Sequence, residues 1–302
     1  MPDLSIVVIN WNTRDLLAQC LQSVYDTISN LDFEVVVVDN ASTDGSQAMV
    51  REHFPEVQLV TNQENMGFAK ANNQAIRVSH GRYILMLNSD TLVRPGALEA
   101  MVRFADQHPE AGIVGCQLLN ADGSLQLSWA QFPTFWSELS GCNVRKRRLI
   151  ADASAHEVDW VGGACLLARR KAIEKVGSLD EGFFMYSEEA DWCFRMVSRG
   201  WKIYYFMGAQ VVHVGGSSSR QASDKMFVQL YQSKLRFFRK HYGPFRGELL
   251  RISLIMISWA KGWGLAALSL WKPTDDPSRY SYRRHWMLAR KLWCESRAGL
   301  EH

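Results

Sequence analysis

The chain has few cysteines, and none has the spacing of a redox or zinc motif. Six occur among the 302 residues, and no two of them form a Cys-x-x-Cys pair. They are Cys20, Cys116, Cys142, Cys165, Cys193 and Cys294. Several lie in apolar runs, so we expect reduced, buried thiols and neither disulfides nor a structural zinc site.

Glycine-rich phosphate loops are also missing. Neither GxGxxG nor GxxxxGK[ST] occurs, which excludes the dinucleotide fingerprint and the Walker loop. The N-terminus, Met1-Pro2-Asp3, has no basic segment before an apolar run, so no signal peptide is expected. No nucleic-acid-binding motif is present, and we expect no nucleic-acid partner. The last residues, 300–302, are interpreted as a remnant of a purification tag.

Positive charge is concentrated in the last quarter of the chain. The net charge is +3, but residues 225–297 contain 15 lysines and arginines against 4 acidic residues. The remainder therefore carries a net negative charge. This asymmetry indicates that the acidic N-terminal part and the basic C-terminal tail have different functions.

Apolar runs and amphipathic segments alternate along the first two thirds of the chain. The runs 5–9, 33–38, 57–60 and 82–87 predict strands, and segments such as 68–78 and 188–198 predict helices. A hairpin turn is expected at 120–124, a strand at 161–168, and two further strands at 202–206 and 211–214. The pattern favours a doubly wound, mostly parallel α/β sheet with helices on both faces, followed by a helical appendage from about Lys225.

Small polar residues follow the ends of several predicted strands and the loop before one helix. A parallel sheet gathers such residues along one edge, where ligands bind. Asp39 could accept from a nucleobase or ribose, Gly67 allows close backbone approach, and Asp90 could hold a divalent metal. Turn formation and helix capping are the alternative role for each residue. The set comprises Asn10, Asn12, Asp39, Asn40, Asn65, Gly67, Asn73, Asn88, Ser89 and Asp90.

Three carboxylates, Glu188, Glu189 and Asp191, open the predicted helix 188–198. Such clustering raises carboxylate pKa values and suits a general base. The preceding aromatic run, Phe183, Phe184 and Tyr186, would form an apolar wall of the kind that sugar faces prefer. The alternative is an acidic first turn that complements the helix dipole.

His213 closes an apolar strand just before Gly215-Gly216. A lone strand histidine is often a satisfied structural residue. On the same edge as Asp90, however, it would complete a mixed oxygen and nitrogen site suited to Mn²⁺ or Mg²⁺.

In this order and spacing, the motifs resemble those of the inverting family 2 glycosyltransferases, in particular the rhamnosyltransferase-like branch that uses dTDP-L-rhamnose. The resemblance covers about residues 4–240. It rests on Ser5–Asn12, Val38–Ser46, Asn65-Met66-Gly67-Phe68-Ala69, Leu87-Asn88-Ser89-Asp90, Glu188-Glu189-Ala190-Asp191 and His213.

The resemblance implies a GT-A nucleotide-sugar fold over residues 1–240. It implies that Asp39 contacts the nucleotide base, that Asn65 to Asn73 lie on the nucleotide-sugar side, and that Asp90 and His213 bind the metal. Glu189 falls at the position of the catalytic base, and Trp160 would join the acceptor wall. Two residues depart from the family pattern. Asn88 stands where the first Asp of the DxD motif is usual. Glu189 stands where the base is usually Asp, so the resemblance does not decide which of Glu188, Glu189 and Asp191 is the base.

The tail, residues 241–299, contains a long apolar segment at 249–271. Arg251 and Lys261 interrupt it, which disfavours a membrane span. Arg251, Ser258, Gly262 and Ser269 share a narrow stripe of a helical wheel, and Trp259, Trp263 and Trp271 lie away from it. Further on, basic residues alternate with tryptophans, namely Arg283, Arg284, Trp286, Arg290, Lys291, Trp293 and Arg297. This pattern is typical of a helix in the interface of an anionic membrane; two helices packed on the catalytic domain, or in a homodimer, are the alternative.

We therefore expect a metal-dependent inverting transfer of a sugar, L-rhamnose from dTDP-L-rhamnose, to a hydroxyl of a glycan or a polyprenyl-diphosphate-linked acceptor. Such a reaction belongs to cell-surface polysaccharide synthesis, in the cytoplasm at the inner face of the membrane. The alternatives are a UDP-sugar donor (hexose or galactofuranose) on the same fold, or a nucleotide-sugar-binding scaffold with weak catalysis.

Overall fold

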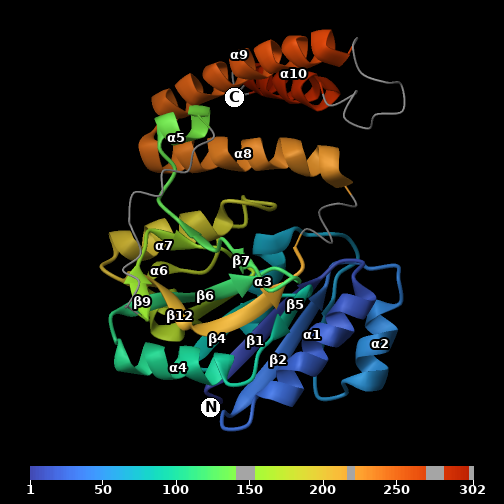
Figure 1. Ribbon diagram of the computed structural model, residues 1–302, viewed down its shortest axis with the longest axis vertical. Coiled ribbons are helices and arrows are strands. Elements are labelled where there is room, and N and C mark those ends of the chain that lie inside the picture. The colour runs from blue at the N-terminus through green and yellow to red at the C-terminus, as the bar shows by residue number, and fades with distance from the viewer. Residues whose placement is uncertain (141–153, 216–221, 270–281, 299–302) are drawn as a thin grey trace. The chain divides into compact units, whose positions relative to one another are not determined.

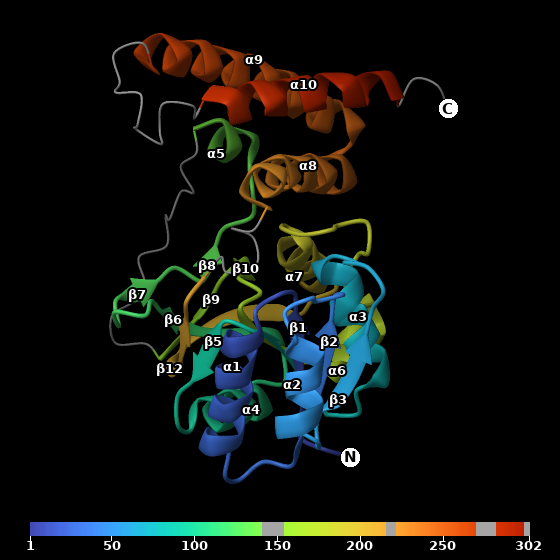
Figure 2. The same ribbon diagram turned by 90° about the vertical axis from the view of Figure 1, so that its right-hand side faces the viewer.

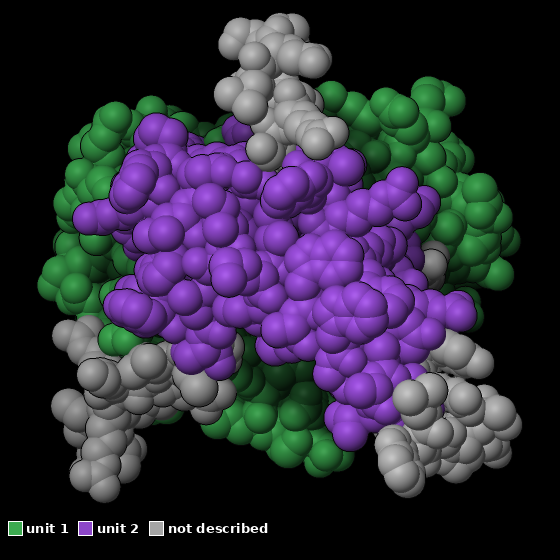
Figure 3. All heavy atoms as spheres, turned by 90° about the horizontal axis from the view of Figure 1, so that it is seen from above, with its two compact units in different colours: residues 1–132, 143–184, 188–220 green, residues 133–142, 185–187, 221–302 purple. Residues whose placement is uncertain are grey.

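A computed structural model describes residues 1–140, 154–215, 222–269 and 282–298, with side chains up to 294 in the last helix. Cys142, Trp271, the Arg297 side chain and the 300–302 ending therefore lie outside the described residues. The chain forms two compact units, coloured separately in Figure 3. Unit 1 comprises Met1–Phe132, Asn143–Phe184 and Glu188–Arg220, and unit 2 comprises Pro133–Cys142, Met185–Ser187 and Gln221–His302. The longest continuous part of unit 2 begins at Gln221, and two shorter segments from earlier in the chain belong to the same unit.

Unit 1 is an α/β sandwich (Figure 1). Its strands are β1 (Leu4–Asn10), β2 (Phe33–Asp39), β3 (Gln58–Thr61), β4 (Tyr83–Asn88), β5 (Thr91–Val93), β6 (Ala111–Leu119), β7 (Leu125–Gln126), β8 (Trp129–Ala130), β9 (Ala155–Glu157), β10 (Trp160–Val161), β11 (Cys165–Arg169) and β12 (Lys202–His213). Its helices are α1 (Arg14–Thr27), α2 (Ser46–His53), α3 (Phe68–Val78), α4 (Ala97–Gln107), α6 (Arg170–Val176) and α7 (Glu188–Ser198).

The main sheet runs in the order β3-β2-β1-β4-β11-β6-β12-β5 within the described residues. The first four strands are parallel, and the continuous apolar runs of β1, β2 and β4 are buried, as is typical of such a sheet. β11 is inserted antiparallel between β4 and β6, and β12 runs parallel to β6. The predicted α/β architecture is confirmed. The two strands expected at 202–214 are one strand, β12, which continues through a bulge between Phe206 and Gln210.

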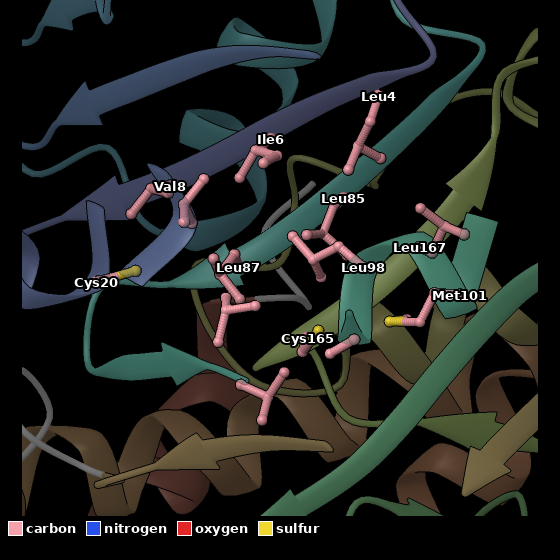
Figure 4. Close-up of a cluster of buried hydrophobic side chains, with 14 of the residues drawn as sticks. Leu4, Ile6, Val8, Cys20, Leu85, Leu87, Leu98, Met101, Cys165 and Leu167 are labelled. Atoms are coloured by element: carbon pink, nitrogen blue, oxygen red, sulfur yellow. The ribbon is translucent and has the colours of Figure 1, made fainter. Parts of the chain in front are cut away.

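Helices cover both faces of this sheet (Figure 2). On one face, alternate side chains of β1 and β4 pack against α1 and α4, as Leu85, Cys20 and Leu98 illustrate in Figure 4. α3, α6 and α7 lie against the other face. Cys20, Cys116, Cys165 and Cys193 are buried free thiols, as predicted, whereas Cys294 is exposed.

The short strand β5 determines where the polar ends of β4 and β12 meet. It follows β4 after a tight turn and pairs antiparallel with β12, with His213 opposite Thr91. The backbone N–H of Val214 donates to the carbonyl of Asp90 at 3.0 Å. The sequence did not predict β5, yet this pairing brings Asp90 and His213 together.

Unit 2 is helical and consists of α5 (Phe135–Ser140), α8 (Ser223–Tyr242), α9 (Pro244–Ser269) and α10 (Tyr282–Ala298). α9 and α10 lie side by side in both ribbon views (Figures 1 and 2). The polar stripe of α9 faces α10: the Arg251 guanidinium donates to the carbonyl of Leu292 at 2.7 Å and also bonds Glu248. Gly262 leaves room for the indole of Trp286, which a Cβ there would strike.

Candidate active site

Asp39, at the end of β2, organises the loop beside it. Its carboxylate accepts from the Asn10 amide at 2.9 Å, from the backbone N–H of Ser42 at 2.9 Å and from the Gln47 amide at 2.8 Å. The side chain is 1% exposed, and Asn10 is fully buried. Asp39 therefore fixes the 40–46 loop against the end of β1, and a ligand at this edge would meet a rigid rim.

The remaining residues of this edge extend the same network. The Asn12 side-chain oxygen accepts from the backbone N–H of Thr43 at 2.8 Å. Ser89 lies 2.9 Å from the hydroxyl of Thr13, which in turn donates to Asn10. The ends of β1, β2 and β4 are thus joined by side-chain hydrogen bonds, as expected for the carboxyl ends of parallel strands.

Gly67 is required by a close contact within the chain. Its φ of +80° lies in the left-handed region, and a Cβ there would be 2.5 Å from the carbonyl oxygen of Phe184. That carbonyl accepts from the backbone N–H of Phe68 at 2.6 Å. Asn65 accepts from the N–H of Gly67, and Asn40 donates to its carbonyl. The loop at Asn65 to Gly67 therefore holds the segment that leads to the acidic helix.

Asn73 lies outside the Asp39 network and, like the Asn65 to Gly67 loop, supports the segment before α7. Its side-chain amide donates to the carbonyl of Leu179 at 2.8 Å and accepts from the N–H of the same residue at 3.0 Å. The structure therefore does not bring Asn73 to the Asp39 network. Instead, Asn73 anchors the chain just before the aromatic run.

Asp90 and His213 meet beside this network, since Asp90 directly follows Ser89. Nε2 of His213 lies 3.3 Å from Oδ1 of Asp90 and 3.3 Å from the side-chain nitrogen of Asn88. Asp90 is 7% exposed. The other ring nitrogen, Nδ1, lies 2.6 Å from Oε1 of Gln126.

Gln126, which sequence reasoning missed, fixes the tautomer of His213. Its amide nitrogen donates to Asn120 at 2.9 Å and to the carbonyl of His213 at 3.2 Å, so Oε1 must be the atom that faces Nδ1. Nδ1 therefore carries the hydrogen, and the lone pair of Nε2 points toward Asp90. The Asn88 amide nitrogen lies within reach of this lone pair and can donate to it, and Oδ1 of Asp90 and Nε2 of His213 together offer an oxygen and a nitrogen ligand that a divalent metal could use. Within the described residues, no third His, Cys, Asp or Glu side chain completes a preformed metal cluster.

The acidic cluster lies in the first turn of α7, as predicted. Asp191 is fully buried and bonds the Arg195 guanidinium at 2.8 Å, a pairing that the i, i+4 spacing could have revealed. Glu188 is buried and Glu189 partly so, and each has a carboxylate oxygen without a hydrogen-bond partner. Burial, reinforced by the charge of Glu189, raises the pKa of Glu188 well above its usual value. Burial also raises the pKa of Glu189, which accepts a backbone hydrogen bond from Gly163.

The aromatic residues differ in their exposure. Phe183 is buried, whereas Phe184 is exposed. Trp160 is partly buried, and its indole N–H donates to the carbonyl of Gln131 at 2.9 Å. Tyr186 belongs to unit 2, and it and Ser187 have φ values of 70° and 65°. Both φ values lie in the left-handed region, and two consecutive non-glycine residues with this conformation make the turn before Glu188 strained.

A family model described as glycosyl transferase family 2 matches residues 5–177, from β1 into the turn after α6. The chain belongs to glycosyl transferase family 2. The enzyme class and the family expected from the ordered motifs are thus confirmed.

Proteins similar to this glycosyltransferase include two rhamnosyltransferases. N-acetylglucosaminyl-diphospho-decaprenol L-rhamnosyltransferase of Mycobacterium tuberculosis is 28% identical over 283 residues, which cover 84% of this chain and 91% of that one. Rhamnosyltransferase WbbL of Escherichia coli is 22% identical over 250 residues, 78% of this chain and 92% of that one.

Solved structures share the fold. A mannosyltransferase from Pyrobaculum calidifontis, in complex with GDP-Man and Mn²⁺, superimposes with a TM-score of 0.55 at 19% identity and covers 96% of this chain and 86% of that one. A structure of GalNAc-T7 with UDP, GalNAc and Mn²⁺ gives 0.57 at 15% identity, with coverage of 70% and 44%. Both of these structures contain Mn²⁺.

Proposed function

We propose that this glycosyltransferase transfers L-rhamnose from dTDP-L-rhamnose to a hydroxyl of a polyprenyl-diphosphate-linked glycan during cell-surface polysaccharide synthesis. The similarity to the mycobacterial rhamnosyltransferase, which covers 84% of this chain and 91% of that one, carries this proposal. Such an acceptor lies in the membrane, so we place the enzyme in the cytoplasm at the inner membrane face.

The donor nucleotide is proposed to bind along the rim formed by the ends of β1, β2 and β4. Asn10, Asp39 and Ser89 hold this rim in place, and Asn12 and Asn40 border it. Because the Asp39 carboxylate already accepts three hydrogen bonds, its main contribution is to keep the loop rigid for the ligand.

Asp90 and His213 are proposed to hold a divalent cation, Mn²⁺ or Mg²⁺, with Asn88 beside them. When bound, such a cation supplies positive charge against the diphosphate that leaves the sugar. Gln126 keeps the Nε2 lone pair of His213 directed at the site.

Glu189 is proposed to be the general base. It is the less buried of the two glutamates, and its raised pKa makes it a stronger proton acceptor than an ordinary carboxylate. Glu189 would take the proton from the acceptor hydroxyl, whose oxygen then forms the new bond to the anomeric carbon as the bond to the diphosphate breaks. One displacement inverts the anomeric centre. Asp191 is neutralised by Arg195, and Glu188 is the more deeply buried partner.

The acceptor is proposed to lie near the exposed ring of Phe184 and the partly buried Trp160. Phe183 would contribute by packing beneath them, and Tyr186 follows in the same run. Apolar faces of sugar rings match such aromatic surfaces.

The test is transfer by the purified full-length chain with Mn²⁺, dTDP-L-[¹⁴C]rhamnose and a short-chain prenyl-diphospho-N-acetylglucosamine acceptor. We expect a radiolabelled lipid product, and its loss in Asp90→Ala. Parallel reactions contain UDP-glucose or UDP-galactofuranose. Transfer from a UDP-sugar but not from dTDP-L-rhamnose would refute the rhamnose assignment. If no donor were either transferred or hydrolysed, the chain would be better explained as a binding scaffold.

A further inference from the structure

The outward face of α9 is a continuous apolar stripe. Phe245, Met256 and Trp263 are 80%, 67% and 64% exposed, and the residues between them on the stripe are also exposed. The spacing alternates between three and four residues, so the side chains line one side of the helix. The stripe comprises Phe245, Leu249, Ile252, Met256, Trp259 and Trp263.

This exposure follows from the way α9 packs. Arg251, Ser258 and Gly262 are buried, and Arg251 and Gly262 are covered by α10. The inward face also buries Leu250, Leu254 and Ile255, so α9 is apolar on both sides and leaves a second row of large apolar side chains exposed, which an amphipathic helix of a soluble protein does not do. A contiguous patch of this kind marks an interaction surface.

Exposed cations accompany the apolar stripe on the two helices. Arg246 and Lys261 are exposed on α9, and α10 adds four more, Arg283, Arg284, Arg290 and Lys291. The acidic residue of α9, Glu248, is engaged by Arg251 and Arg239. The surface thus combines tryptophans, aliphatic side chains and exposed positive charge, which matches anionic headgroups above an acyl layer.

We propose that this face of unit 2 lies on an anionic lipid bilayer, with α9 parallel to the membrane plane. The inference deepens the proposed function, since it says how the enzyme reaches a lipid-linked acceptor. α9 is long and apolar enough to cross a membrane. A crossing would, however, carry Lys261 and Arg251, with its partner Glu248, into the membrane. Two copies of this face would bring like charges together, which disfavours a dimer through it.

The experiment is co-sedimentation of the full-length chain with vesicles of phosphatidylcholine alone or mixed with an equal part of phosphatidylglycerol. We expect binding to the anionic vesicles that weakens in 0.5 M salt, and little binding to the neutral ones. The double variant Met256→Ser/Trp263→Ser should bind at least roughly tenfold more weakly. Lys261→Glu should lose about tenfold, since it removes one cation and adds one anion.

Trp136→Ser is the matched control, because Trp136 is 76% exposed in α5, outside the stripe. It should bind vesicles like the wild type. Circular dichroism and the melting temperature establish that each variant folds, and hydrolysis of dTDP-L-rhamnose without acceptor should be unchanged in all of them. If the wild type bound anionic vesicles but did not hydrolyse dTDP-L-rhamnose, the proposed donor would be refuted and the proposed membrane contact would stand.

Three results would overturn the inference. The wild type could fail to bind anionic vesicles at low salt, or the stripe variant could bind as tightly as the wild type. Sedimentation velocity could instead show a wild-type dimer that Met256→Ser/Trp263→Ser converts to a monomer, without vesicle binding by either. The stripe would then be an interface between copies of this chain.

Discussion

Replacing Gln126 by leucine should weaken Mn²⁺ binding at Asp90 and His213 by about 10–100-fold. Leucine has a similar size but offers no acceptor to Nδ1 of His213, which lies 2.6 Å from the glutamine oxygen. Without that acceptor, the ring hydrogen can move to Nε2, and the lone pair then points away from Asp90. The metal would have to restore the tautomer as it binds.

The magnitude follows from the contacts that are lost. One hydrogen bond contributes about 0.5–1.5 kcal/mol, and about 1.4 kcal/mol corresponds to a factor of ten in affinity. The bond to Nδ1 alone therefore accounts for up to about tenfold. Gln126 also donates to the carbonyl of His213, at 3.2 Å, so its loss frees the strand end as well and extends the effect toward 100-fold.

The assay is a titration of free Mn²⁺ by electron paramagnetic resonance, without donor or acceptor. Gln117→Leu is the matched control, because Gln117 accepts from Gln210 at 2.8 Å between β6 and β12 and is buried to a similar extent. It should change Mn²⁺ affinity by less than about threefold. If Gln126→Leu binds Mn²⁺ like the wild type while Asp90→Asn abolishes binding, the positioning argument is refuted. If Asp90→Asn also binds normally, the metal lies elsewhere.

Three further substitutions test the rest of the site. Glu189→Gln should lower kcat by about 10²–10⁴-fold with little change in the KM for donor, and near-normal turnover in steady-state assays would contradict its role as base. Glu188→Gln should raise the free energy of unfolding at pH 8, because it removes a buried carboxylate whose charged form is unfavourable in the folded state. The gain is about 1.4 kcal/mol for each unit by which folding raises the pKa of Glu188. The gain should vanish below about pH 4, where the carboxyl is protonated in both states, and urea unfolding at both pH values checks this. Gly67→Ala should destabilise the fold by about 1–3 kcal/mol, because the positive φ and the Phe184 carbonyl exclude a Cβ; an unchanged melting temperature would rule this out.

The sequence predicts the elements of the parallel half of the sheet because each strand there is a continuous apolar run. β1, β2 and β4 fall within a residue or two of the expected ranges, and α3 and α7 match them. β5 escapes prediction because three residues are too few to show a period. The antiparallel direction of β11 escapes it because direction depends on the neighbouring strands and leaves no local pattern.

The site could be predicted in part. Polar residues at the ends of strands can be recognised from their position in the sequence, and Asp90 and His213, which were expected to share one edge of the sheet, do meet. Gln126 could not be found in this way, because a glutamine in a short hairpin strand carries no signal of its partner 87 residues later. Gly67 shows a subtler limit. The sequence indicates that something approaches this backbone closely, but the approaching group is the chain's own Phe184.

Asn88 gives the proposed metal site an unusually low charge. Asp90 is its one carboxylate, His213 contributes a neutral imidazole, and Asn88 adds an uncharged amide. Mn²⁺ and Mg²⁺ take about six ligands, so most of the coordination must come from water or from the donor's diphosphate. A site with a single negative charge holds a free cation weakly, whereas the diphosphate adds both ligands and charge. Binding of the cation and binding of the donor should therefore strengthen each other, and by the same factor. If this site holds the cation, we expect Asn88 to affect the order and cooperativity with which cation and donor bind more than the chemistry of transfer.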